Sequence, residues 1–188
     1  MDLYHIALYL HIVAVVVASA ATAVTKLAAA RRARARTIGE VLEWHGILMS
    51  AAKWFPIVLA VFVLTGAFML SRGQASVWGS GFVVAGLVGV VLLFASGTYL
   101  GLKGKALGGF LQSMAAKGID QPAPRLVPPA MVAMLPTVNT GIALAVVFDM
   151  VTKPVSVPLA LGIVALGITI SAALSARRTV PVAKTVAA

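Results

Sequence analysis

The sequence predicts an all-α protein, a polytopic bundle that crosses a membrane with about five helices. Of its 188 residues, 61% are hydrophobic and 11% are charged, whereas a soluble domain carries about 25% charged residues. Several apolar stretches are about 20 residues long, which is the length of a helix that spans a bilayer. The basic residues gather between these stretches. Composition, stretch length and charge placement therefore all indicate a multi-pass membrane protein.

The apolar stretches define the expected transmembrane helices. They run over about Leu3–Thr25, Ala51–Leu70, Val77–Leu102, Ala130–Val151 and Val155–Ala176. The first is too long for the apolar core of a signal peptide, and its positive charges follow it rather than precede it, so we expect it to be retained. Residues 1–178 would then form a single transmembrane bundle, and residues 179–188 a short cytoplasmic tail.

The basic residues predict the direction in which the chain crosses the membrane. Most lie in the first connection, the third connection and the tail: Lys26, Arg31, Arg32, Arg34, Arg36, Lys103, Lys105, Lys117, Arg125, Arg177, Arg178 and Lys184. The second and fourth connections hold one each, Arg72 and Lys153. Cytoplasmic loops are rich in Lys and Arg. We therefore expect the N-terminus outside and the C-terminus inside.

Two connections carry further local signals. Thr37 followed by Glu40 has the spacing of a capping box, which predicts a helix start ahead of the second span. Pro56 is expected to bend this helix near its entry into the membrane. The stretch "KGIDQPAPRLVPP" holds four prolines and few apolar anchors, so we expect it to be the least ordered loop.

Small residues recur at helical spacing within three of the spans. The stripes are Ala7, His11, Ala14, Ala18 and Thr22; Gly97, Gly101, Gly104 and Gly108; and Ala133, Thr137, Gly141 and Ala145. Helices associate in a bilayer where small residues let their backbones approach. The stripes therefore predict the interior of the bundle, and His11 should face protein rather than lipid.

Composition and missing motifs narrow the functional classes. The chain has no cysteine, so disulfides and thiolate metal sites are excluded. Its net charge of +10 is distributed as the positive-inside rule expects, which argues against a nucleic-acid partner. The chain contains no P-loop, GxSxG or HExxH motif. The sequence thus identifies no catalytic residue and leans against an enzyme.

The three histidines, His5, His11 and His45, are the first residues to consider for chemistry. An ionisable group inside a span is a functional hypothesis by default, and imidazole is a common ligand of haem iron and copper. His5 and His11 lie roughly 240° apart around a helix, and His11 and His45 about 25 Å apart in depth. A haem held by two histidines of one subunit is therefore disfavoured. A haem held by His11 alone, or shared across a homodimer, remains open, as does a neutral His11 that bonds a neighbouring helix.

Lys53 and His45 are secondary candidates near a cofactor. Lys53 lies about one turn inside the second span, where it either extends its amine to the headgroups or pairs with an anion such as a haem propionate. His45 follows Glu43 and Trp44 at the membrane interface, which favours a structural role. A looser metal-binding set falls near the outer helix ends: Asp2, His5, Met69, Asp149 and Met150, with His11 as a further candidate ligand. His with Met suits copper, and His with Asp suits harder ions.

Two segments resemble a known family. "ALYLHIVAVVV" resembles a first-helix signature of Leu-His followed by aliphatic residues, and "FPIVLAVFVLTGAFML" resembles a second-helix signature in which a proline, here Pro56, precedes Thr-Gly, here Thr65 and Gly66. Both resemble the bacterial membrane family called domain of unknown function 2269 and, more distantly, the copper-resistance D and HemJ-type groups. The resemblance covers roughly the first 70 residues, and the Trp-x-Gly-Gly that usually follows the histidine is absent here. It implies a small helical bundle in which His11 is the ligand-type histidine.

These observations leave competing functional hypotheses. The first is a small inner-membrane protein that binds haem or a metal through His11 in redox or metal handling. The second is a structural or assembly subunit that docks a membrane protein partner, or a second copy, and has no ligand of its own. A transporter ranks third, because the spans show only a faint repeat between Pro56…Thr65-Gly66 and Pro136…Thr140-Gly141.

Overall fold

The computed structural model describes residues 2–72 and 75–179, and this part of the chain is helical without a strand. Its elements are α1 (Leu3–Arg32), α2 (Ile38–Ala52), α3 (Trp54–Ser71), the short 3-10 helix η1 (Ala75–Gly79), α4 (Gly81–Ala115), α5 (Ala130–Thr152) and α6 (Val157–Thr179). Five segments are long and apolar enough to cross a membrane, with α2 and α3 together forming one of them. The all-α fold and the five segments that could span a membrane are therefore confirmed, whereas the orientation of the termini stays a prediction.

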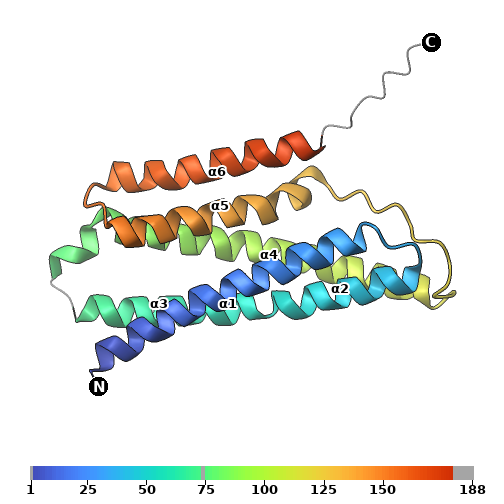
Figure 1. The fold of residues 1–188 in the computed structure, drawn as a ribbon, viewed down its shortest axis with the longest axis horizontal. Helices are drawn as coiled ribbons and strands as arrows, with labels where there is room; N and C mark the ends of the chain where they lie inside the picture. The colour runs from blue at the N-terminus through green and yellow to red at the C-terminus, as the bar shows by residue number, and fades with distance from the viewer. Residues whose placement is uncertain (1, 73–74, 180–188) are drawn as a thin grey trace, which may run out of the picture.

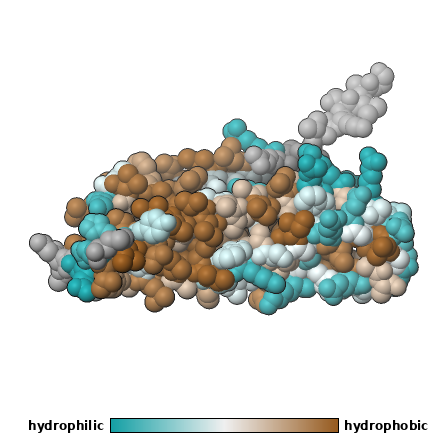
Figure 2. All heavy atoms as spheres, turned by 60° about the horizontal axis from the view of Figure 1, so that its bottom comes forward, coloured by the Kyte–Doolittle hydropathy of each residue, from teal (hydrophilic) through white to brown (hydrophobic). Residues whose placement is uncertain are grey.

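The helices run along the long axis of the molecule in two groups (Figure 1). In one group α1 packs on α2 and α3, and in the other α4, α5 and α6 pack on one another. The groups meet mainly through α2 and α4, at the end of the bundle that also holds the α1–α2 and α4–α5 connections. We call this the basic end, because Arg31, Arg36 and Lys117 lie in or beside those connections. Figure 2 shows the hydrophilic residues gathered there, at the right of the view, beside a broad apolar surface.

An alanine seam holds α1 against its neighbours. Ala7, Ala14, Ala21 and Ala28 are buried, and their spacing of seven residues keeps one face of the helix toward the partner. The methyl side chains let the backbones approach closely, as in membrane helix pairs. The predicted stripe on α1 is confirmed at Ala7 and Ala14, while His11 is half-buried beside it.

The interruption in the second span lies where the proline predicts it. α2 ends at Ala52 and α3 begins at Trp54, with Lys53 between them. Pro56 has no amide hydrogen, and its ring crowds the carbonyl of Ala52 four residues earlier. The continuous helical ladder is therefore broken at this point.

The start of α2 carries the Thr37 half of the predicted capping box, while Glu40 reaches back to the residue before Thr37. The Glu40 amide donates to Thr37 Oγ1 at 3.3 Å, and Glu40 Oε2 accepts from the amide of Arg36 at 2.8 Å. The proline-containing loop, expected to be the least ordered, is attached to this helix start. The amides of Ile38 and Gly39 donate to the carbonyls of Gln121 and Ile119 at 3.0 and 2.9 Å. The loop is thus held by backbone hydrogen bonds that its composition does not reveal.

α4 differs most from its predicted boundaries. It begins at Gly81 rather than Val77, and it continues past Lys103 to Ala115. The extension packs on α2, where Leu111 is fully buried. Burial against α2 stabilises helical residues that their glycines alone would disfavour.

The second group has a tight core of small residues. Ala85, Ala145, Ala160 and Val164 form a buried cluster between α4, α5 and α6. At Gly167 a Cβ atom would come within 2.7 Å of the backbone oxygen of Gly141. α5 and α6 therefore approach at a distance that only glycine allows.

Candidate functional site

His11 is bound to the neighbouring span. Its Nδ1 lies 2.8 Å from Oγ1 of Thr65, a buried residue of α3. The ring also makes an edge contact with Phe62, with ring centroids 4.9 Å apart. A Cβ added at Gly66 would lie 3.9 Å from His11 Cε1, which is ordinary van der Waals contact. His11 thus faces protein as predicted, and its partner is the Thr-Gly motif of α3.

The Thr65 hydroxyl fixes the tautomer of His11. Thr65 Oγ1 lies 2.6 Å from the carbonyl oxygen of Val61, one turn earlier in α3. A threonine hydroxyl has a single proton, and this proton is donated to that carbonyl. Toward His11 the hydroxyl therefore accepts, so the imidazole donates from Nδ1 and keeps a lone pair on Nε2.

The second nitrogen of His11 is available for binding. His11 Nε2 has no hydrogen-bond partner among the described residues. Among the described residues, the two carboxylate oxygens of Asp149 are the only side-chain oxygens or nitrogens that are both fully buried and unpaired. Because His11 Nε2 is unpaired but is not one of these atoms, it must reach the surface of the chain. A histidine with one nitrogen held and the other free has the arrangement of a metal ligand.

His45 has a different environment, at the basic end. The residue is buried, Arg32 Nη1 donates to its Nδ1 at 2.9 Å, and its Nε2 donates to the Gly104 carbonyl at 3.1 Å. Both ring nitrogens are engaged, because an arginine can only donate. His45 therefore joins α1, α2 and α4 and has no lone pair left for iron. The sequence indicated its structural role but not these partners.

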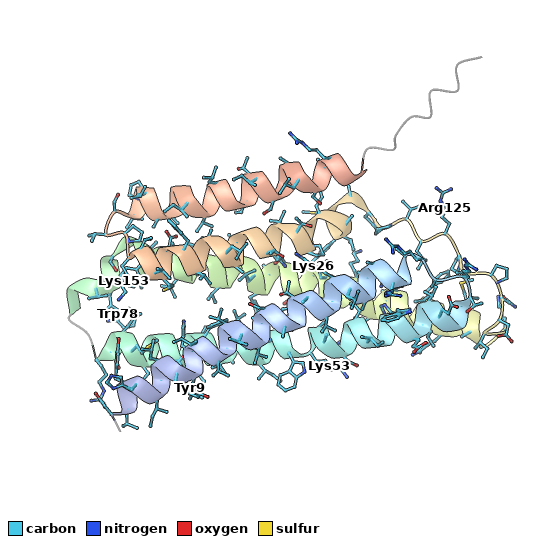
Figure 3. The ribbon with its side chains drawn as sticks, in the orientation of Figure 1. Tyr9, Lys26, Lys53, Trp78, Arg125 and Lys153 are labelled. Atoms are coloured by element: carbon cyan, nitrogen blue, oxygen red, sulfur yellow. The ribbon has the colours of Figure 1, made fainter. Side chains whose placement is uncertain are left out.

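Lys53 and His5 lie on the surface. Lys53 is exposed between α2 and α3, and its side chain points away from the helices (Figure 3). His5 is exposed near the start of α1, with Nδ1 4.0 Å from a carboxylate oxygen of Asp2. Neither side chain approaches His11. The exposure of Lys53 is compatible with an amine that extends to the headgroups, and that role stays a prediction.

The predicted metal-binding set is not brought together. Within residues 2–72 and 75–179 no three His, Asp or Glu side chains form a group that could hold a metal ion. His5 lies beside Asp2, His11 beside Thr65, and Asp149 is buried in α5. Met150 packs toward Gly86 of α4. Position near a helix end was too coarse a criterion, because it does not specify which face of the helix a residue occupies.

A haem with two ligands from this one chain does not fit these residues. His45 is fully engaged and Lys53 points outward. Two open grooves, one between α5 and α6 and one between α1 and α2, include none of His11, His45 and Lys53 in their lining. Of the three cofactor-binding candidates, His11 is the one that keeps a ring nitrogen without a hydrogen-bond partner among the described residues.

A polar pair in the other helix group escaped the sequence analysis. The Ser96 hydroxyl of α4 donates to Asn139 Oδ1 of α5 at 2.8 Å. Asn139 lies in the middle of an apolar span, where an amide needs a partner. That isolated asparagine was the signal from which the contact could have been found.

Comparisons with family models, curated proteins and solved structures found no match for this chain. The resemblance to the domain of unknown function 2269 family stays a prediction. The two segments on which it rests are in contact, since His11 of the first is bound to Thr65 of the second.

Proposed function

We propose that this chain is a multi-pass protein of the bacterial inner membrane that binds haem iron or a metal ion through His11, and that it serves redox or metal handling. The supporting observation is a pair of consecutive hydrogen bonds, from His11 Nδ1 to Thr65 Oγ1 and from Thr65 Oγ1 to the Val61 carbonyl. Histidines that bind a metal through one nitrogen commonly donate a hydrogen bond from the other, which fixes the orientation of the ring and its tautomer.

The position of His11 limits what the site can do. It lies eight residues beyond the first residue of α1, so it is about 12 Å along the helix from that end. A bound haem or copper would supply one-electron chemistry in the outer half of the membrane. The protein contributes one oriented nitrogen and an apolar surround that includes Phe62.

The test is an absorption spectrum with a metal analysis. We expect protein purified gently in detergent to carry a Soret band or a bound metal ion, and His11→Ala to lose it. His5→Ala is the matched control, because His5 is an exposed histidine on the same helix. A wild type that contains neither chromophore nor metal, although both were supplied during growth, contradicts the proposal.

The second candidate function is that of a subunit in a larger membrane complex. Its supporting observation is on α4, where a Cβ at Gly97 or Gly101 would meet no atom within 4 Å. These glycines are four residues apart in an apolar helix, which is the spacing that lets a second transmembrane helix approach closely. Gly104 and Gly108 of the same predicted stripe are already covered by Met49 and His45 of α2.

A further inference from the structure

We propose that Asp149 is a proton-binding site inside the membrane, which holds a proton while α4, α5 and α6 are packed together and releases it when they separate at that end. The proposal concerns the helix group opposite His11, and it does not depend on a ligand at His11. It rests on the burial of one carboxyl group and on the absence of any partner for it among the described residues.

Asp149 is enclosed by the tight packing of its helix. Its exposed fraction is 0%, and both carboxylate oxygens are buried without a hydrogen-bond partner in the described part of the chain. It lies one turn beyond Ala145 on the face of α5 that meets the buried alanine and valine cluster. Close approaches at Gly86 and Gly89 of α4, to Met150 and Val146, bring α4 against the same end of α5.

No charged group on the packed helices compensates Asp149. The apolar parts of α4 (residues 81–102) and α6 (residues 157–176) contain no Asp, Glu, His, Lys or Arg, and Asp149 is the single such residue of α5. The basic residues near this end are Lys153, which caps α5, and Arg72 after α3. Both are exposed, and neither forms an ion pair with Asp149 within 4.0 Å.

The protonated carboxyl is the form that this environment accepts. An ionised carboxylate without donors in a dry interior is so unfavourable that the group takes up a proton instead. A metal ion is a poor substitute for the proton, because it needs several oxygen ligands and no group of three acidic or histidine side chains lies there among the described residues. The closed helix packing and the bound proton therefore stabilise each other.

Proton release requires the carboxylate to reach water or a cation. Asp149 lies three residues before the last residue of α5, or about 5 Å along the helix from that end. Lys153 begins the connection to α6 with a left-handed backbone (φ 50°) and has an exposed side chain. Figure 3 shows Lys153 at the same end of the bundle as Trp78, so the proton would leave at this end. Separation of α5 from α4 there would let Asp149 ionise beside Lys153.

The decisive test compares the thermal stability of the wild type and Asp149→Asn from about pH 5 to about pH 9. The folded protein binds a proton that the unfolded chain releases, so wild-type stability should fall as pH rises, with a Tm decrease of at least about 3 °C. Asp149→Asn keeps a neutral side chain of the same shape, and its Tm should not show this part of the decrease. Asp120→Asn is the matched control, because Asp120 is exposed. Parallel profiles for the wild type and Asp149→Asn would overturn the proposal.

A chemical label gives an independent answer that needs no variant. An apolar carbodiimide such as dicyclohexylcarbodiimide adds to protonated carboxyl groups in apolar surroundings. In lipid vesicles near pH 7 we expect a mass-spectrometric adduct at Asp149 and none at the exposed acids Asp2, Glu40, Glu43 and Asp120. Adduct formation that Na⁺ prevents, and choline at equal ionic strength does not, would assign a cation rather than a proton to Asp149. An adduct pattern without preference for Asp149 would likewise contradict the proposal.

Discussion

At the scale of single residues, the three histidines lie in three different environments. His5 is solvated beside Asp2, His11 is held through one nitrogen, and His45 is held through both. The sequence predicted the inward position of His11 from its place on a stripe of small residues. It could not predict the partners, because Thr65, Arg32 and Gly104 approach the histidines only through the packing of separate helices.

The Thr65 hydroxyl should determine how tightly His11 binds its ligand. Thr65→Val removes the acceptor and leaves the Nδ1 hydrogen unpaired, so we expect affinity for the metal or haem to fall 10- to 100-fold, as when such hydrogen-bonding partners are removed elsewhere. Thr65→Ser keeps the hydroxyl and should bind nearly as well as the wild type. Titration of the purified apoprotein, followed by its absorption spectrum, measures this. Equal affinities for Thr65→Val and the wild type would mean that Thr65 does not orient the ligand.

At the scale of helices, apolar length predicted five spans but not the full lengths of the helices. α4 extends well beyond its predicted span, whereas the helix start ahead of the second span was predicted from the capping box at Thr37. The part of α4 beyond its predicted span packs against α2, and Ile38, Val41 and Leu111 are buried there. A criterion based on twenty apolar residues stops at the first lysine, whereas the helix continues wherever a neighbour covers it. The helix start capped by Thr37 and the break before Pro56 were predicted from local signals, and both are confirmed.

The open glycines of α4 lead to a prediction about assembly. Gly97→Leu or Gly101→Leu would block the close approach of another helix, so we expect loss of the partner or dimer while the monomer folds normally. Gly162→Leu is the matched control, because Gly162 is an exposed glycine of α6 whose Cβ would also meet nothing within 4 Å. Chemical cross-linking in membranes, with mass spectrometry of the products, reads the result. An unchanged cross-linking pattern in the Gly97→Leu and Gly101→Leu variants would exclude this face as an interface.

At the scale of the whole molecule, the charge distribution and the fold agree on two distinct ends. The connections at the basic end carry most of the arginines and lysines, and the opposite connections carry Arg72 and Lys153. His11 and Asp149 belong to different helix groups, but both lie in the half of their spans away from the basic end. If the basic end is cytoplasmic, both sites lie in the outer half of the membrane, which determines where an electron partner or a proton would be found.

This orientation can be tested with single cysteines, because the chain has none of its own. Ser156→Cys lies in the α5–α6 connection and Ser113→Cys on α4 at the basic end, and both serines are exposed. In intact cells a membrane-impermeant maleimide should label Ser156→Cys, because cytoplasmic loops are the basic ones, and it should reach Ser113→Cys only after the membrane is permeabilised. The reverse pattern would place the His11 and Asp149 ends inside. The proton at Asp149 would then exchange with the cytoplasm, and the source of electrons or metal for His11 would have to be sought there.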